Sequence, residues 1–157
     1  MNKDVLFDEA LLDRFINEVK EKYPKKAFGY FISDTEGGHP VDFIMFNDDV
    51  RNEWKDEFEK YGQYYVSHED AGFLATEEET YEVTKKIQAM NMKIVGVYHS
   101  HQRHPAVFST VDVDLHPSEK IWHLIISLRN FNMPQLKAFA VNKGQVSELA
   151  IKKVEEV

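Results

Sequence analysis

Two histidines and an aspartate near the middle of the chain are the residues whose types and spacing best suit chemistry. His99 and His101 stand two positions apart after an apolar run, Ile94–Tyr98, and Asp112 follows eleven positions after His101. The run predicts a strand buried on both faces. Since residues two apart in an extended segment point to the same side, we expect both imidazoles to face one point just beyond the strand.

Two imidazoles and one carboxylate suit a zinc site that keeps its fourth position open for water, as catalytic zinc requires. The same residues also have a structural interpretation. Ser109 and Asp112 are spaced as in a capping box that starts a helix, and His99 then becomes a hydrogen-bonded core histidine. We favour the metal site, because the strand, the His-x-His pair, the serine and the aspartate occur together at these spacings.

These residues match a known motif. His99-Ser100-His101, Ser109 and Asp112 resemble the JAMM motif of the Mov34/MPN/PAD-1 metalloproteases, and the segments GVYHSH and HPAVFS look like the small prokaryotic members. The resemblance extends over most of the chain, including a helix, a proline and a glycine-containing strand near the start. It implies an α/β (α+β) fold of the MPN/JAB-like (cytidine deaminase-like) type, with a curved, mostly antiparallel sheet flanked by helices.

The resemblance also implies an activity. Family members are zinc enzymes that cut an isopeptide or peptide bond following a ubiquitin-like protein, and in bacteria a sulfur-carrier tail is a candidate substrate. His99, His101 and Asp112 would hold Zn²⁺, and Ser109 would hydrogen-bond the oxyanion or position the water.

The chain departs from the family at one catalytic position. Active members carry a glutamate three residues before the glycine of the first strand, and here that position is Lys26, before Gly29. An ammonium about 5 Å from a dication would be repelled by about 6–7 kcal/mol at an effective dielectric of 20. At the metal, Lys26 would therefore have to point away from the ion, lose its proton, or lower the affinity for the metal. The other interpretation is that Lys26 is a solvated surface lysine with no role at the metal. Glu21 and Glu36 are not in register to replace the glutamate.

Composition narrows the class of protein. The 157 residues predict one domain, 1–157, with 43% hydrophobic residues and a net charge of −8, which argues against binding to nucleic acid or an anionic membrane. The chain has no cysteine, so a reducing cytoplasm is expected. The N-terminus does not resemble a signal peptide.

Periodicity predicts the elements around the site. Helices are expected over 8–22, with Asp8 as N-cap, and over 77–91, and short helices over 47–63 and from Asp112 to about 116. The spacing predicts buried faces formed in the first helix by Leu12, Phe15, Ile16 and Val19, and in the second by Val83, Ile87 and Met90. Strands are expected over 27–33, 41–46, 64–67, 94–98, 121–128, 136–141 and 146–151. His104, His116 and His123 are interpreted as loop or strand residues and not as ligands.

Three functional hypotheses follow. The first is the zinc metallopeptidase described above, with Lys26 or no residue acting as acid and base. The second is a pseudoenzyme, with or without zinc, that binds a ubiquitin-like tail or a partner subunit without cutting it. Trp54 and Phe58 belong to an apolar stripe on the helix expected over 47–63, which either packs on the domain core or forms part of a groove for a partner's tail. The third is a metal-binding or regulatory module unrelated to peptides.

Overall fold

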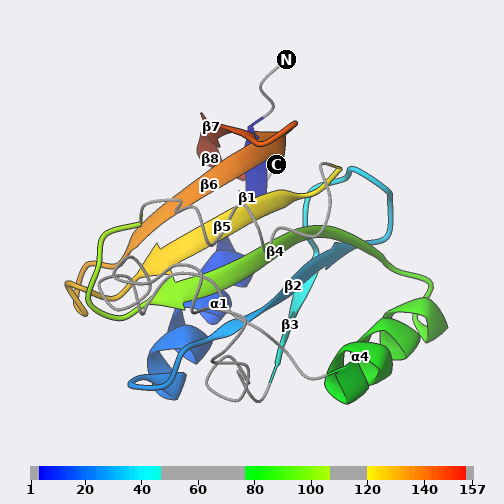
Figure 1. Cartoon of the computed structure of the whole chain (residues 1–157), viewed down its shortest axis with the longest axis horizontal. Helices are drawn as coiled ribbons and strands as arrows, with labels where there is room; N and C mark the ends of the chain where they lie inside the picture. Colours follow the sequence, from blue (N-terminus) through cyan, green and yellow to red (C-terminus); the bar gives the residue numbers. More distant parts are fainter. Residues whose placement is uncertain (1–3, 47–76, 107–119, 155–157) are drawn as a thin grey trace.

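The computed structural model describes residues 4–46, 77–106 and 120–154 and shows a mixed α+β fold (Figure 1). The elements follow one another as β1 Val5–Asp8, α1 Glu9–Lys22, β2 Phe28–Ser33, β3 Asp42–Met45, α4 Glu77–Ala89, β4 Lys93–His101, β5 Trp122–Ser127, β6 Gln135–Asn142, β7 Gln145–Leu149 and β8 Ile151–Val154. The expected fold class, a mostly antiparallel sheet with two helices, is confirmed.

Six strands form the main sheet in the order β3-β2-β4-β5-β6-β7. Every neighbouring pair runs antiparallel except β4 and β5, which run parallel. The two parallel strands lie at the centre, where both of their edges are paired and both of their faces are covered. This position explains why β4 and β5 read in the sequence as nearly continuous apolar runs.

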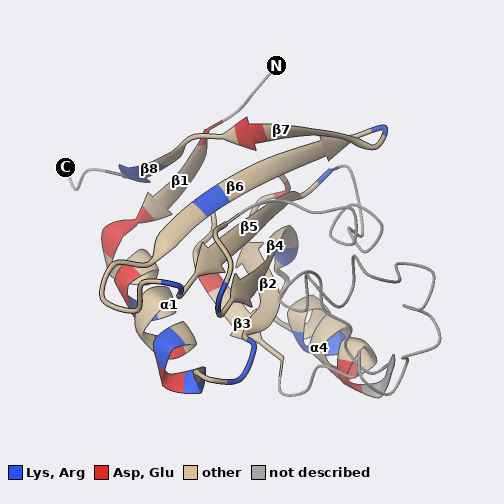
Figure 2. Cartoon of the chain, turned by 60° about the vertical axis from the view of Figure 1, so that its left-hand side comes forward, with Lys and Arg blue, Asp and Glu red and all other residues tan. Residues whose placement is uncertain are grey.

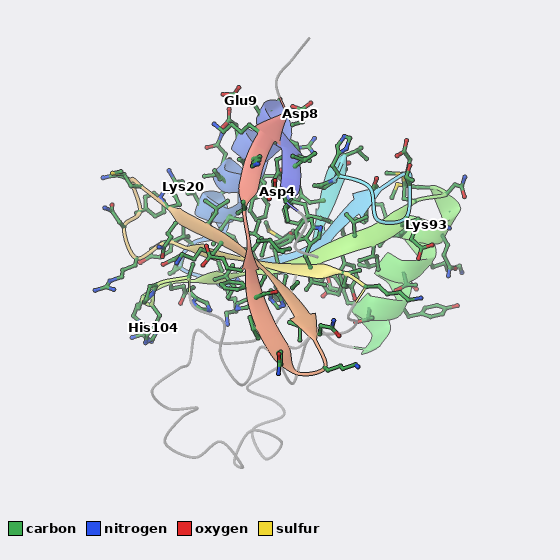
Figure 3. All side chains as sticks on the ribbon, turned by 90° about the horizontal axis from the view of Figure 1, so that it is seen from above. Asp4, Asp8, Glu9, Lys20, Lys93 and His104 are labelled. Carbon is green, nitrogen blue, oxygen red and sulfur yellow. The ribbon has the colours of Figure 1, made fainter. Side chains whose placement is uncertain are left out.

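Helix α1 covers one face of this sheet (Figures 1 and 3). Asp8 caps it as expected, because its carboxylate accepts a hydrogen bond from the Ala10 N–H at 2.8 Å. Phe15 lies at the centre of the contact, with its ring 4.9 Å from that of Phe31 and 4.8 Å from that of Tyr98. The apolar face that the spacing predicts is buried at Leu12, Phe15 and Val19 and partly buried at Ile16.

A separate two-stranded sheet joins the two ends of the chain, and sequence analysis missed it. Strand β1 pairs in parallel with β8, and the single strand expected over 146–151 is instead divided at Ala150 into β7 and β8. Exposed ion pairs Asp4–Lys152 and Glu9–Lys153, at 2.8 and 3.7 Å, accompany the pairing. Short parallel strands far apart in sequence leave no periodic signal, which is why neither was distinguished.

Helix α4 leads directly into β4. Its end is a Schellman motif, in which Asn91 adopts a positive φ of 55° and the Met92 N–H donates to the Ile87 carbonyl at 3.1 Å. Ile87 is buried, but Met90, expected on the same buried face, is 43% exposed. That expectation is wrong because the helix ends at Ala89 and the turn carries Met90 outward.

The contact between β2 and β4 depends on a glycine. A Cβ on Gly29 would lie 1.9 Å from the Ile44 carbonyl oxygen and 2.8 Å from the Tyr98 hydroxyl. Without it, the buried Tyr98 hydroxyl donates to that carbonyl at 3.1 Å. One side chain of β4 is thereby tied across β2 to β3.

Several expected elements lie outside the described residues. They are the helices over 47–63 and after Asp112, the strand over 64–67, and the stripe containing Trp54 and Phe58. No helix in the described part of the chain is long and apolar enough to cross a membrane.

We predict a stability change at alkaline pH that depends on Tyr98. Burial, and secondarily the charge of Glu18, raises the pKa of the Tyr98 hydroxyl well above its usual 10.0. The unfolded chain then loses this proton first, so stability is complete below pH 10 and falls as the pH rises toward the folded-state pKa. Tyr98→Phe should lower the free energy of unfolding by about 0.5–1.5 kcal/mol at pH 7. In urea unfolding, this variant should lose less stability between neutral and alkaline pH than the unmodified protein. Equal alkaline slopes for Tyr98→Phe and the exposed control Tyr23→Phe would contradict this.

Candidate functional site

Strand β4 carries both histidines within the sheet. It extends through His101, beyond the expected strand end at Tyr98. Pairing on both sides prolongs it, with Phe28 of β2 opposite His99 and Ser127 of β5 opposite His101. The two-residue spacing still places both imidazoles on one face, and both are buried, at 0% and 3% exposure.

This face is opposite to the one that α1 covers. Tyr98 packs against Phe15 of α1, so the alternating side chains of His99 and His101 point away from the helix. Strands β4 and β5 carry no Lys, Arg, Asp or Glu apart from Lys93 at the start of β4 (Figure 2). The imidazoles are therefore buried among uncharged strand residues, where each ring nitrogen needs a partner.

The two imidazoles turn the same ring nitrogen toward each other. Their Nε2 atoms lie 3.1 Å apart, and Nδ1 of His101 lies 2.8 Å from the carbonyl oxygen of Pro105. Because a carbonyl oxygen only accepts, Nδ1 of His101 carries a proton and donates it. In the neutral ring, the Nε2 lone pair of His101 is then directed at His99. A carbonyl holding the other nitrogen in this way is typical of metal-binding histidines.

The separation of the two nitrogens also suits a metal. Two zinc–nitrogen bonds of about 2.0–2.1 Å at a tetrahedral angle put the nitrogens about 3.3 Å apart, close to the 3.1 Å found here. Among the described residues, no group of three or more His, Cys, Asp or Glu side chains could hold a metal. The expected ligand Asp112 and the expected catalytic Ser109 lie outside those residues, so the complete ligand set stays a prediction.

The loop after β4 is tied to the neighbouring strands. The Ser127 hydroxyl donates to the His104 carbonyl at 2.5 Å, and the Ala106 N–H donates to the Gln135 side chain at 3.0 Å. These bonds hold Pro105, the acceptor for His101, in place. His104 lies in this loop, as expected. The loop follows the end of β4 that is far from Lys93 (Figure 3).

A pocket of about 570 Å³ opens beside the same loop. Two of its lining residues, Pro105 and Ser127, belong to the surroundings of His101. The others come from the start of β6 and the loop that precedes it: Arg129, Asn130, Phe131, Met133 and Gln135. The pocket therefore offers space for a polypeptide segment next to the paired histidines.

Lys26 comes just before the start of β2, next to a residue that is bonded to β4. The Ser100 N–H donates to the Ala27 carbonyl, and the Ala27 N–H donates to the Ser100 hydroxyl, both at 2.8 Å. Because Phe28 is opposite His99, an extended backbone from Phe28 back to Lys26 would put Lys26 on the histidine face beside His101. Lys26 is half-buried, whereas Lys25 is exposed.

The two alternative carboxylates lie elsewhere. Glu21 belongs to α1, which covers the opposite face, and Glu36 lies in the turn after β2, at the other end of that strand from His99. Both are exposed. This agrees with the expectation that neither is in register with the motif.

Sequence analysis interpreted His123 as a strand residue only, and the structure shows that it also contacts the site. It lies in β5, buried at 1% exposure, with its Nε2 atom 2.7 Å from Nδ1 of His99. A histidine inside the apolar run IWHLIISL was the available signal, since a buried imidazole needs a polar partner. The partner's identity depended on the register between β4 and β5.

Comparisons with known proteins identify the family. A family model described as prokaryotic homologs of the JAB domain matches residues 8–141. The chain belongs to this family. No curated protein matches it.

Solved structures support the same fold. A solution structure from Desulfitobacterium hafniense is similar over 98% of this chain and 94% of that one, at 20% identity and a TM-score of 0.66. A solution structure from Salinibacter ruber (strain DSM 13855) is similar over 96% of this chain and 92% of that one, at 19% identity and a TM-score of 0.63. A crystal structure of a JAB1/MPN domain protein from Archaeoglobus fulgidus is similar over 96% of this chain and 99% of that one, at 14% identity and a TM-score of 0.51. The expected MPN-type fold is thereby confirmed.

We predict that Ser100→Ala destabilises the protein and loosens Lys26. The substitution leaves the buried Ala27 N–H without the hydroxyl that it donates to, which costs about 1–3 kcal/mol. Urea unfolding measures the loss. The control is Ser33→Ala, another buried serine of the sheet, whose hydroxyl makes only bonds of 3.3 and 3.5 Å. Equal stability of the two variants would contradict the special role of Ser100.

Proposed function

We propose that this JAB-family chain is a zinc-dependent metallopeptidase or isopeptidase of the JAMM type, hydrolysing the bond that follows the tail of a ubiquitin-like or sulfur-carrier protein. The observation that carries the proposal is the buried pair of imidazoles with Nε2 atoms 3.1 Å apart. The Pro105 carbonyl supports it further, because a proton donated from Nδ1 of His101 leaves the lone pair of the neutral ring on Nε2, which is the atom that would bind a metal.

The proposed roles follow from the residue types. His99, His101 and Asp112 would hold zinc, which would act as a Lewis acid and lower the pKa of a water in its open position. Ser109 would donate a hydrogen bond to the oxyanion. The pocket beside His101 would receive one of the two polypeptide segments joined by the scissile bond.

Lys26 decides between this function and the alternative. In neutral form, a half-buried lysine beside the metal would accept a proton from the attacking water and return it to the leaving amine. In charged form it would repel the metal and supply no base. The alternative is therefore a catalytically impaired member that binds a ubiquitin-like tail or a partner subunit without cleavage, and the lysine at the position where active members carry a glutamate is the sequence feature that favours it.

We predict that the purified protein binds about one zinc per chain. His99→Ala should lose most of it, because two ligands of a three-residue site bind far more weakly. Metal content after mild dialysis, measured by mass spectrometry, tests this. The control is His39→Ala, which removes an exposed histidine in the turn after β2. A chain that takes up no zinc even after its addition would overturn the enzyme hypothesis.

We predict that Lys26→Glu increases cleavage of a ubiquitin-like fusion protein. A carboxylate at this position restores general acid–base catalysis, which contributes about 10²–10⁴-fold in rate, and removes the repulsion between an ammonium and the metal. The matched control is Lys25→Glu, which changes the charge equally at the exposed neighbouring lysine.

The outcomes separate the hypotheses. Cleavage by the unmodified protein that His101→Ala abolishes supports the peptidase. Cleavage by Lys26→Glu alone supports the impaired enzyme, as does binding of the tail without cleavage by either form. Equal rates for Lys26→Glu and Lys25→Glu would show that Lys26 does not occupy the catalytic position.

A further inference from the structure

His123 is a buried imidazole that the proposed reaction does not use. It lies in the interior of β5, between Val97 of β4 and Phe139 of β6 in the register of the sheet. Its exposure is 1%, and its Nε2 atom lies 2.7 Å from Nδ1 of His99. The rings of His99 and His123 are nearly perpendicular, at 88°.

The two contacts of His99 differ in a way that assigns them different roles. The 2.7 Å separation from His123 is that of a strong hydrogen bond and is too short for two nitrogens bound to one zinc, which lie about 3.3 Å apart. The 3.1 Å separation from His101 is compatible with a shared metal. His99 therefore turns Nε2 toward the candidate metal position and Nδ1 toward His123.

The Pro105 carbonyl sets the direction of the hydrogen bonds when the rings are neutral and no metal is present. It requires a proton on Nδ1 of His101, so Nε2 of His101 accepts from Nε2–H of His99. Nδ1 of His99 then accepts from Nε2–H of His123. All three imidazoles form one chain of hydrogen bonds that ends at the carbonyl.

We propose that His123 is a positioning residue that accepts the Nδ1 proton of His99 when His99 binds a metal through Nε2. To present a lone pair at Nε2, His99 must carry its proton on Nδ1 and donate it to His123. The hydrogen bond between the two rings reverses without movement of either ring. The proton on Nε2 of His123 passes to Nδ1 of His99, His123 takes up a proton at its own Nδ1, and His99 releases the proton at Nε2, so the number of protons is unchanged.

This inference rests on the proposed metal site and adds a residue to it. A ligand histidine is oriented by the group that accepts from its other nitrogen, and removal of that group weakens metal binding by about 10–100-fold. For His101 the acceptor is the Pro105 carbonyl. For His99 the structure assigns this role to His123, which belongs to the parallel neighbouring strand.

The test compares zinc affinity among variants by competition with a chelator. His123→Phe fills the site with a ring that cannot accept a proton, and should weaken zinc binding by about 10–100-fold. His123→Gln offers an acceptor at a similar distance from the backbone and should recover most of the affinity. The control is Leu124→Ala, a core substitution on the opposite face of β5, which lowers stability without touching the imidazoles.

We expect the affinity for zinc to fall in His123→Phe, to recover in His123→Gln, and to stay unchanged in Leu124→Ala. Unchanged affinity in His123→Phe, with zinc lost in His99→Ala, would overturn the role of His123 while leaving the metal site intact. Unchanged zinc binding in His99→Ala would instead overturn the metal site itself.

A measurement on the unmodified protein gives an independent answer if His123→Phe does not fold. Nitrogen-15 NMR of the imidazoles distinguishes the two tautomers. With zinc bound, His99 should carry its proton on Nδ1, and in the zinc-free neutral protein on Nε2. A tautomer of His99 that does not change on zinc addition would overturn the proposal.

Discussion

The pairing of β4 with a neighbour on each side is the constraint on which the rest of the structure depends. Strand β2 pairs with one edge, where Gly29 leaves room for the Tyr98 hydroxyl of β4 to reach the Ile44 carbonyl of β3, and β5 pairs in parallel with the other edge. The pairing with β5 continues to His101, and that with β2 continues to His99 and the Ser100 N–H, so His99 and His101 are held by backbone hydrogen bonds within a sheet. Ligands on such a strand have little freedom, which is what a metal site requires.

The site is a small polar network on an otherwise apolar face. A buried donor or acceptor without a partner costs about 1–3 kcal/mol, so each imidazole nitrogen has to be satisfied by another group. Here the partners are other imidazoles and a backbone carbonyl, held by the loop that the Ser127 hydroxyl ties to β5. The arrangement reaches across β4 and β5, and it orients both Nε2 atoms toward the same place.

In the proposed site, Lys26 would give a charge balance different from the pattern of active family members. The fold agrees with solved structures at 20% identity or less, one of them a JAB1/MPN domain protein, so the sheet tolerates wide variation in sequence. The charge at Lys26 would not affect the pairing of β2, because that pairing uses the backbone of Ala27 and the hydroxyl of Ser100. Catalytic chemistry and fold can therefore vary separately at this point.

The sequence by itself determined the family, the mixed fold, the extents of α1 and β2, and the shared face of His99 and His101. These follow from local periodicity, capping residues and a motif in which spacing implies direction. Only the tertiary structure decided that β4 extends through His101, that β1 pairs with β8, and that His123 contacts His99. Each of these depends on the register between segments far apart in the chain, and register is set by packing of the whole sheet, which no local pattern records.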